Sequence, residues 1–266
     1  ARIAPPLMQP GLGKLSIGAA LSPEGRADFD TLLLEADAAL YAHKASGGGA
    51  GVIYAAARHA SHSALLVRPR FERALLNDEI EAHFQPVIAL DTGARLGFEL
   101  LARWRDPERG LLAPGQFSSV LAAPELAEQL TRHLFDKAFA QLAARTDLAD
   151  MTLAVNLGTA DLVRRDFLPE MQARLARFGM DWARLVIEVT ETTMMGAVSG
   201  PVFQALTGLR ERGARVALDD FGTGYAGLTH LRRWPVDILK IDRDYIADAA
   251  RSERDAVFTK ALIDIA

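Results

Sequence analysis

The 266-residue chain contains no cysteine. Disulfides, thiolate metal sites and cysteine nucleophiles are therefore excluded, and the absence fits a reducing compartment. No uninterrupted apolar run reaches the roughly 18 residues that a membrane-spanning helix needs, and no basic-then-apolar leader opens the chain. We expect a cytoplasmic chain without membrane contact, although sequence outside it could carry an anchor.

An excess of basic charge is also missing. Thirty Lys and Arg stand against 34 Asp and Glu, which gives a formal charge of −4. A partner made of duplex nucleic acid normally requires a basic surface, so that class is disfavoured. A small anionic ligand held through metal ions remains compatible with the charge. Half of the residues are hydrophobic, which is enough for a sizeable core.

The first 57 residues are too few to form a core of their own. They contain a predicted strand at Lys14–Leu21, apolar residues at helical spacing over Phe29–His43, and a short strand at Val52–Tyr54. A glycine run separates the last two elements. We interpret residues 1–57 as the end of a domain whose front is absent, and residues 58–68 as a linker.

The main body begins at residue 69 with a predicted helix, Pro69–Asp78, which leads into a pair of strands, Glu81–Leu90 and Ala94–Trp104. The three-residue turn between them forces an antiparallel pair. Predicted strands and helices then alternate, at 125–144 (helix), 151–157 (strand), 161–178 (helix), 184–190 (strand), 202–213 (helix), 214–220 (strand), 236–242 (strand) and 245–265 (helix). This order predicts an α/β fold with a parallel sheet. A closed barrel and an open, doubly wound sheet both fit it.

Acidic and amide side chains recur where these strands end. They are Glu99, Asn156, Glu188, Asp219 and Asp220, with Lys240 on the last strand. Each is flanked by apolar residues, and an isolated charge there is costly unless it pairs or binds a metal. The carboxyl ends of parallel strands share one edge, so these groups should converge. Ligands that are all oxygens indicate a hard cation such as Mg²⁺, Mn²⁺ or Ca²⁺, and a two-metal centre suits phosphodiester hydrolysis.

Two basic residues fit the same chemistry. Lys240 could orient a water or neutralise a phosphate, and Arg103 lies four residues from Glu99, hence on the same face of the strand. The alternative is a set of structural ion pairs, Arg103 with Glu99 and Lys240 with an aspartate.

A glycine pattern offers a different hypothesis. Gly222, Gly224 and Gly227 match G-x-G-x-x-G after a strand, and Asp242 follows at 20 residues, as in dinucleotide-binding sites. The preceding pair of aspartates would repel a pyrophosphate unless metal intervenes. We therefore favour glycines that let a loop fold tightly beside the acids.

From residue 69 onward the chain resembles the EAL family of cyclic di-GMP phosphodiesterases. The matching motifs are FQPVIALDTGARLGFELLARW, VNL, EVTE and DDFGTGYAGLTHLRRWPVDILKID. The preceding LSIGAAL and LLLEADAALYAHKASGGG resemble the C-terminal end of a GGDEF domain. The resemblance implies a TIM-type (β/α)8 barrel with an antiparallel first strand, whose last two units are absent from this chain, preceded by an α+β fragment.

The resemblance also implies an activity, the hydrolysis of cyclic di-GMP to linear pGpG in bacterial second-messenger signalling. It assigns Glu99, Asn156, Glu188 and Asp219 to a first Mg²⁺ or Mn²⁺, and Asp219 with Asp220 to a second, with Ca²⁺ inhibitory. Lys240 would contact the nucleophilic water, and Asp242 would support the site beside Lys240. Glu191 would anchor the loop at 221–228. Gln85 and Arg103 would contact the substrate. A homodimer formed through the EAL domain is the family expectation.

Departures from the family pattern leave a second hypothesis open. Leu100 stands where the EAL triplet has alanine, and Ala226 and Gly227 replace two usual serines. The chain also ends before the family's last glutamate and its Gln-Gly-Tyr motif, so we expect the parent protein to continue. The alternative function is a non-catalytic cyclic di-GMP receptor. Receptors typically lose metal ligands, whereas every ligand this chain is long enough to contain is present.

Overall fold

The structure is a computed structural model. It describes residues 16–22, 32–33, 35–36, 39–40, 43, 51–53, 55, 67–194, 196–221, 231–249 and 251–265. The chain divides into two compact units. One contains residues 1–81 with 102–127, and the other contains residues 82–101 with 128–266.

A small parallel sheet lies near the start of the first unit. Strand β1 (Ile17–Ala19) pairs with β2 (Gly51–Ile53). A Cβ on Gly18 would lie 2.1 Å from the carbonyl oxygen of Ala36, so only glycine fits there. Both strands fall within or beside the predicted ones, and every described residue between 32 and 43 is helical as predicted.

Aromatic side chains form the core of the rest of this unit. A helix covers residues 67–76. Its Phe71 stacks on Phe117 with ring centroids 5.4 Å apart and meets the edge of Trp104 at 5.6 Å. All three rings are at most 2% exposed. Packing of this kind contributes about 0.5–1.5 kcal/mol per aromatic pair beyond the burial of area.

A short strand that the sequence did not predict, β5 (Gly110–Leu112), pairs antiparallel with the end of β4 (Arg95–Asp106). The buried carboxylate of Asp106 forms the turn between them. It accepts the N–H groups of Glu108 and Arg109 at 2.9 and 3.0 Å, and both of its oxygens bind Arg70. The short 3-10 helices η2 (Pro114–Gln116) and η3 (Ser118–Ala122) follow.

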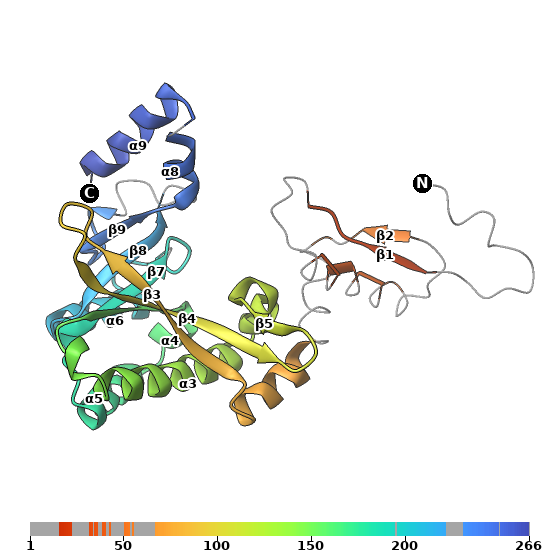
Figure 1. Ribbon diagram of the computed structural model, residues 1–266, viewed down its shortest axis with the longest axis horizontal. Helices are drawn as coiled ribbons and strands as arrows, with labels where there is room; N and C mark the ends of the chain where they lie inside the picture. Colours follow the sequence, from red (N-terminus) through yellow and green to blue (C-terminus); the bar gives the residue numbers. More distant parts are fainter. Residues whose placement is uncertain are drawn as a thin grey trace, which may run out of the picture. The chain divides into compact units, whose positions relative to one another are not determined.

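The large sheet has the order β3-β4-β6-β7-β8-β9, with β5 beside β4 (Figure 1). Its remaining strands are β3 (Ile80–Ile88), β6 (Thr152–Asn156), β7 (Leu185–Thr190), β8 (Arg215–Phe221) and β9 (Ile238–Ile241). From β4 to β9 every neighbouring pair along this order is parallel. The connection between β3 and β4 is too short for a crossover, so this pair is an antiparallel hairpin. The mixed α/β sheet predicted from the sequence is therefore confirmed.

Two predicted helices prove to be broken. The helix predicted at 161–178 is divided into α4 (Thr159–Leu162) and α5 (Phe167–Phe178). Arg164 lies between them and pairs with acids of α3 (Pro124–Ala143) and α5. The second consists of α8 (Arg243–Ala249) and α9 (Glu253–Ile265). There the Ser252 hydroxyl accepts the N–H of Asp255 at 3.1 Å, which caps a new helix. The remaining long helix, α6 (Pro201–Glu211), begins one residue before its predicted range of 202–213 and ends two residues before that range does.

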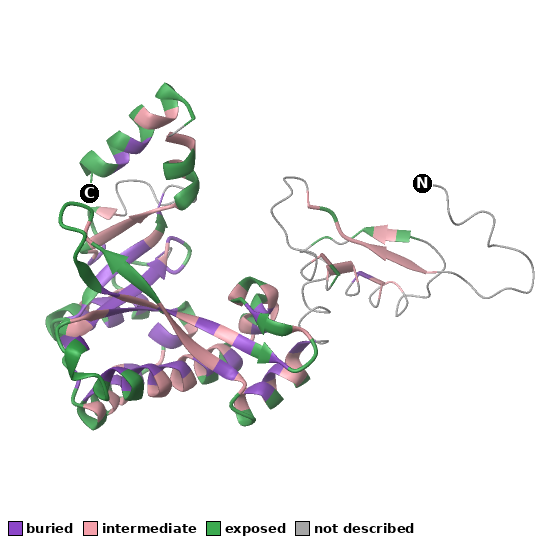
Figure 2. Cartoon of the chain, viewed as in Figure 1, coloured by how far each residue is buried: buried purple, intermediate pink, exposed green. Residues whose placement is uncertain are grey.

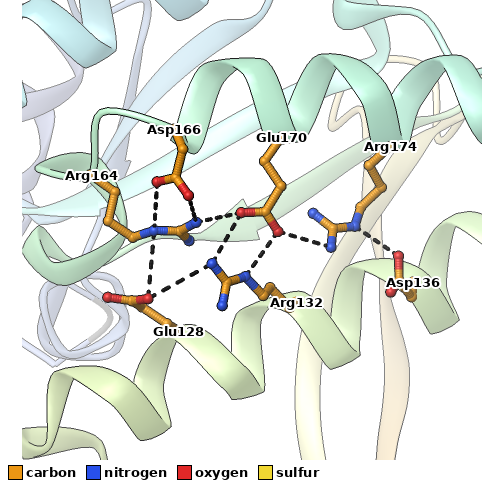
Figure 3. Close-up of polar contacts among 7 residues, drawn as sticks. All are labelled: Glu128, Arg132, Asp136, Arg164, Asp166, Glu170 and Arg174. Atoms are coloured by element: carbon orange, nitrogen blue, oxygen red, sulfur yellow. Dashed lines mark hydrogen bonds and ion pairs between the residues drawn. The ribbon is translucent and has the colours of Figure 1, made fainter.

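A network of ion pairs joins α3 to α5 (Figure 3). The Glu170 carboxylate accepts bonds from three guanidinium groups, including Arg132 Nε at 2.9 Å and Arg174 Nη2 at 3.2 Å, with Arg164 as the third. Burial by itself would raise the pKa of Glu170, but the bonds from Arg132 and Arg164 outweigh it and lower the pKa to about 2. Glu170 thus stays charged at every physiological pH.

Burial is concentrated in the strands of the second unit (Figure 2). In β7 every residue except Thr190 is buried, as expected for a parallel strand with both faces covered. The pair α8–α9 is mostly exposed, with Thr259 and Leu262 as the buried residues of α9. No described helix is long and apolar enough to span a membrane.

Candidate active site

An apolar layer lies across four neighbouring parallel strands of the large sheet. Ala154, Val186 and Ala217 form one buried cluster, and Ile238 packs against it. These residues come from β6, β7, β8 and β9 in turn. Because side chains alternate along a strand, the residue two positions further along each strand faces the same side.

Those next residues are polar. They are Asn156 on β6, Glu188 on β7, Asp219 on β8 and Lys240 on β9. The register places Asn156 directly beside Glu188. Glu99 on β4 pairs in register with Ala154 and so faces the same side. Strands β6 to β9 therefore present a polar layer toward their carboxyl ends, over an apolar layer, and Glu99 from the middle of β4 faces the same side. The sequence predicted that these polar groups converge.

The ammonium of Lys240 lies at the centre of this layer. Its Nζ is 2.8 Å from Glu188 Oε1, 3.1 Å from Asp219 Oδ1 and 3.5 Å from Glu99 Oε2. We refer to Glu99, Glu188, Asp219 and Lys240 as the Lys240 cluster. Asn156 contacts it through a long bond of 3.4 Å from Nδ2 to Glu99 Oε1.

Burial controls the charge of the cluster. Glu188 is 3% exposed, and desolvation raises its pKa to about 7 although Lys240 opposes the rise. Burial alone would lower the pKa of Lys240, but the hydrogen bond with Glu188 and the charges of Glu99 and Asp219 raise it. Lys240 therefore remains an ammonium ion, and it partly compensates the three acids around it.

A β-bulge brings the two adjacent aspartates to this site. In the ladder between β8 and β9, Leu218 pairs with Leu239 and Phe221 pairs with Ile241. Asp219 and Asp220 therefore stand opposite the single residue Lys240. Asp220 adopts a left-handed φ of 54°, and its N–H donates to Asp219 Oδ1 at 3.1 Å. A regular strand would direct the two carboxylates to opposite faces, and the bulge changes that alternation.

Burial raises the pKa of Asp220, and the negative charges of Asp219 and Asp242 raise it further. Asp242 follows β9 directly, and its Oδ1 accepts the N–H of Asp244 at 2.8 Å, where α8 begins. Both residues therefore belong to the electrostatic surroundings of the Lys240 cluster.

The other predicted residues are less closely tied to it. Glu191 is buried directly after β7. Gln85 is exposed on β3, and Arg103 on β4 donates to the carbonyl of Ala102 at 2.7 Å. The glycine pattern and the predicted loop after Phe221 fall on residues 222–230, which lie outside the described residues.

The chemistry of the site fits hard cations. Carboxylate and amide oxygens are the ligands that Mg²⁺ and Mn²⁺ prefer. Among the described atoms, Glu188 Oε2 is buried and lacks a hydrogen-bond partner, which leaves an acceptor available for a ligand. Nevertheless, among the described residues no group of three or more His, Cys, Asp or Glu side chains lies close enough together to hold a metal ion. Lys240 supplies the positive charge in this arrangement.

Sequence reasoning missed two features of the site. One is the apolar layer beneath the Lys240 cluster, which a search two residues before each polar position would have found. The other is an ion pair between Arg210 and Asp237, which lies just before β9. No local pattern indicates that pair, because its partners are far apart in sequence.

Residues 68–266 match the family model described as EAL domain. The chain belongs to the EAL domain family. The match includes all the strands that carry the polar layer. The family resemblance inferred from the motifs is confirmed.

Named relatives agree with the family. Two proteins of Pseudomonas aeruginosa are similar over most of the chain. Cyclic di-GMP phosphodiesterase NbdA is 34% identical over 94% of this chain and 32% of its own length. Bifunctional diguanylate cyclase/cyclic di-GMP phosphodiesterase MucR is 32% identical over 93% of this chain and 36% of its own length. The chain thus spans about a third of the length of these relatives.

A solved structure has a similar fold. The structure named PaMucR Phosphodiesterase, c-di-GMP complex, is 31% identical, covers 75% of this chain and 81% of its own, and superposes with a TM-score of 0.69. The described sheet of this chain therefore has the fold of that phosphodiesterase structure.

Proposed function

We propose that the EAL part of the chain hydrolyses cyclic di-GMP to linear pGpG. The observation that carries this proposal is the Lys240 cluster, in which three acids from three strands converge over an apolar layer. The names of the relatives NbdA and MucR, and the ligand named for the MucR structure, support the substrate.

The reaction adds one water molecule. Its oxygen forms a bond to one phosphorus, the bond from that phosphorus to a ribose O3′ breaks, and a proton ends on O3′. The acids Glu99, Glu188, Asp219 and Asp220, with the amide oxygen of Asn156, would hold two divalent cations, Mg²⁺ or Mn²⁺. When bound, such cations lower the pKa of water and neutralise the charge that develops on phosphoryl oxygens.

The basic residues would orient the reactants. Lys240 Nζ, freed from part of its contacts with the acids, would donate a hydrogen bond to the attacking water. The planar guanidinium of Arg103 would bind a phosphate oxygen of the substrate, and Gln85 would contact the nucleotide. Asp242 and Glu191 would support the segments that follow β9 and β7.

A non-catalytic receptor is the second candidate. The observation in its favour is that Lys240 already pairs with the acids, so part of their negative charge is compensated without a cation. Such a receptor would bind cyclic di-GMP in the presence of a chelator and would not convert it.

One experiment distinguishes the two candidates. The purified protein is incubated with cyclic di-GMP and either Mg²⁺ or Mn²⁺, products are separated by chromatography, and binding is measured by calorimetry in Ca²⁺. Metal-dependent formation of pGpG supports the enzyme, whereas binding without turnover supports the receptor. Neither binding nor turnover would refute both. Glu211→Gln, an exposed change on α6, is the control for site variants.

We further propose the organisation of the protein around this domain. Residues 1–57 are the end of a GGDEF domain and residues 58–68 a linker. The match with MucR supports this division, because it covers 93% of the chain whereas the EAL model begins at residue 68. The sheet closes into a TIM-type barrel in the whole protein, which acts in the cytoplasm as a homodimer through its EAL domain.

A further inference from the structure

The strand that carries Lys240 is weakly held where the lysine lies. Strand β9 has four residues and, among the described strands, pairs only with β8. The bulge at Asp219 and Asp220 interrupts the ladder opposite Lys240. A bulge leaves its extra residue unpaired, so regular ladder bonds do not fix the lysine at this point.

Asp237 supplies a separate attachment just before β9. Its Oδ2 accepts the N–H of Val216 on β8 at 2.9 Å, and its own N–H donates to the carbonyl of Val216 at 2.8 Å. The carboxylate also binds Arg210 on α6, with Nε at 3.0 and 2.9 Å from the two oxygens and Nη2 at 2.5 Å from Oδ1. One side chain therefore joins α6, β8 and the start of β9.

This arrangement matters because strand register decides which face a side chain occupies. A slip of one residue would turn Lys240 to the opposite face of the sheet and would replace it by a neighbouring apolar residue. All three contacts of Lys240 with Glu99, Glu188 and Asp219 would be lost together.

We propose that Asp237 is a positioning residue for Lys240. It fixes the register of β9 on β8 and so places the lysine ammonium among the acids of the site. The catalytic consequence rests on the proposed phosphodiesterase function, whereas the structural consequence does not.

Two substitutions separate the roles of the carboxylate. Asp237→Asn keeps an oxygen that can accept from Val216 N–H, and Asp237→Ala removes both that acceptor and the partner of Arg210. The matched control is Asp147→Ala. Asp147 also binds one arginine through two bonds, with Arg145 at 2.8 and 2.7 Å, but it lies before β6 and away from β8 and β9 in the sequence.

Turnover and hydrogen exchange are both measured. Because Lys240 orients water rather than substrate, Asp237→Ala should lower kcat for cyclic di-GMP by about tenfold or more and change KM by less than about threefold. Asp237→Asn should restore kcat to within about threefold of wild type. In Asp237→Ala, amides of β9 should exchange at least about tenfold faster, while those of β6 stay unchanged.

Several outcomes would overturn the proposal. Equal kcat and equal β9 exchange in Asp237→Ala and Asp147→Ala would do so. A loss of protection spread equally over β6 and β9 would also do so, because it would show a merely structural role. If Asp237→Ala fails to fold, Arg210→Ala is compared with Asp147→Ala by the same two measurements, and equal β9 exchange in the two refutes the proposal. If the wild type does not hydrolyse cyclic di-GMP, the proposed function fails, and β9 exchange alone decides the register inference.

Discussion

Replacing Gly97 by alanine tests the approach of β4 to β6, on which the position of Glu99 depends. Gly97 pairs with Thr152 in register, and Glu99 lies two residues further along β4 on the same face. A Cβ at Gly97 would lie 2.3 Å from the carbonyl oxygen of Thr152 and 2.3 Å from its Oγ1. The main-chain contact cannot be relieved by a change of rotamer, so the strands must separate.

The magnitude follows from these distances. An ordinary contact of a Cβ begins at 3.4 Å, so the strands must part by about 1 Å locally. Overpacking of this kind costs about 1–3 kcal/mol, and the lower entropy of the unfolded alanine chain returns about 0.4–1 kcal/mol. We expect a net loss of about 1–2 kcal/mol, which lowers Tm by roughly 2–8 °C. Displacing Glu99 by about 1 Å should reduce kcat by roughly 10- to 100-fold.

Thermal unfolding and turnover are measured beside two other variants. Gly115→Ala is the matched control, since a Cβ there would meet no atom within 4 Å. It should leave Tm unchanged or raise it slightly. Adding Thr152→Ala to Gly97→Ala removes the clash with Oγ1 but not the clash with the carbonyl. It should therefore recover less than half of the lost stability.

The reasoning fails if Gly97→Ala unfolds at the same temperature as Gly115→Ala. It also fails if the double variant recovers wild-type stability, because the clash would then be with a side chain that can move. A normal Tm with reduced kcat would locate the effect at Glu99 but would contradict the predicted strand separation.

Three further predictions concern the site and the helices. Glu188→Gln should abolish hydrolysis with unchanged circular dichroism, because the amide keeps the shape and loses the charge that holds cations; full activity would refute the ligand assignment. The Glu170 pKa of about 2 lies below its unfolded value near 4.5, so its stabilisation is complete above about pH 4.5 and is lost as pH falls toward 2. After allowance for solvent screening, Glu170→Gln should lower the free energy of unfolding, measured with urea, by about 1–2 kcal/mol at pH 7 and by little at pH 2. Equal losses at the two pH values would contradict this prediction. Gly179 ends α5 with a φ of 62°, so Gly179→Ala should cost about 1 kcal/mol in the same assay, whereas an unchanged midpoint would show that the cap relaxes.

Much of the site was predictable because its residues follow local rules. Apolar residues around Glu99, Asn156, Glu188 and Asp219 placed these groups on strands, and parallel strands bring groups near their carboxyl ends to one edge. The hairpin followed from a short turn. The family followed from long motifs in a fixed order. These features depend on spacing along the chain, which the sequence contains.

Errors arose where distant segments compete with local propensity. The stretch at 161–178 was predicted as one helix, yet it divides between Leu162 and Phe167, and Arg164 in the gap pairs with acids on α3 and α5. Strand β5 exists because the buried Asp106 organises a turn with Arg70, 36 residues away. Local periodicity contains no information about partners that far along the chain.

The sequence by itself determined which side chains reach the site, but the tertiary structure decided how they meet. Asp219 and Asp220 are adjacent, and alternation alone would separate them. Only the pairing of β8 with β9 shows that both stand opposite Lys240. The physical reason is that a bulge and a strand register are properties of two paired strands, and neither strand's sequence states how many residues its partner will place opposite it.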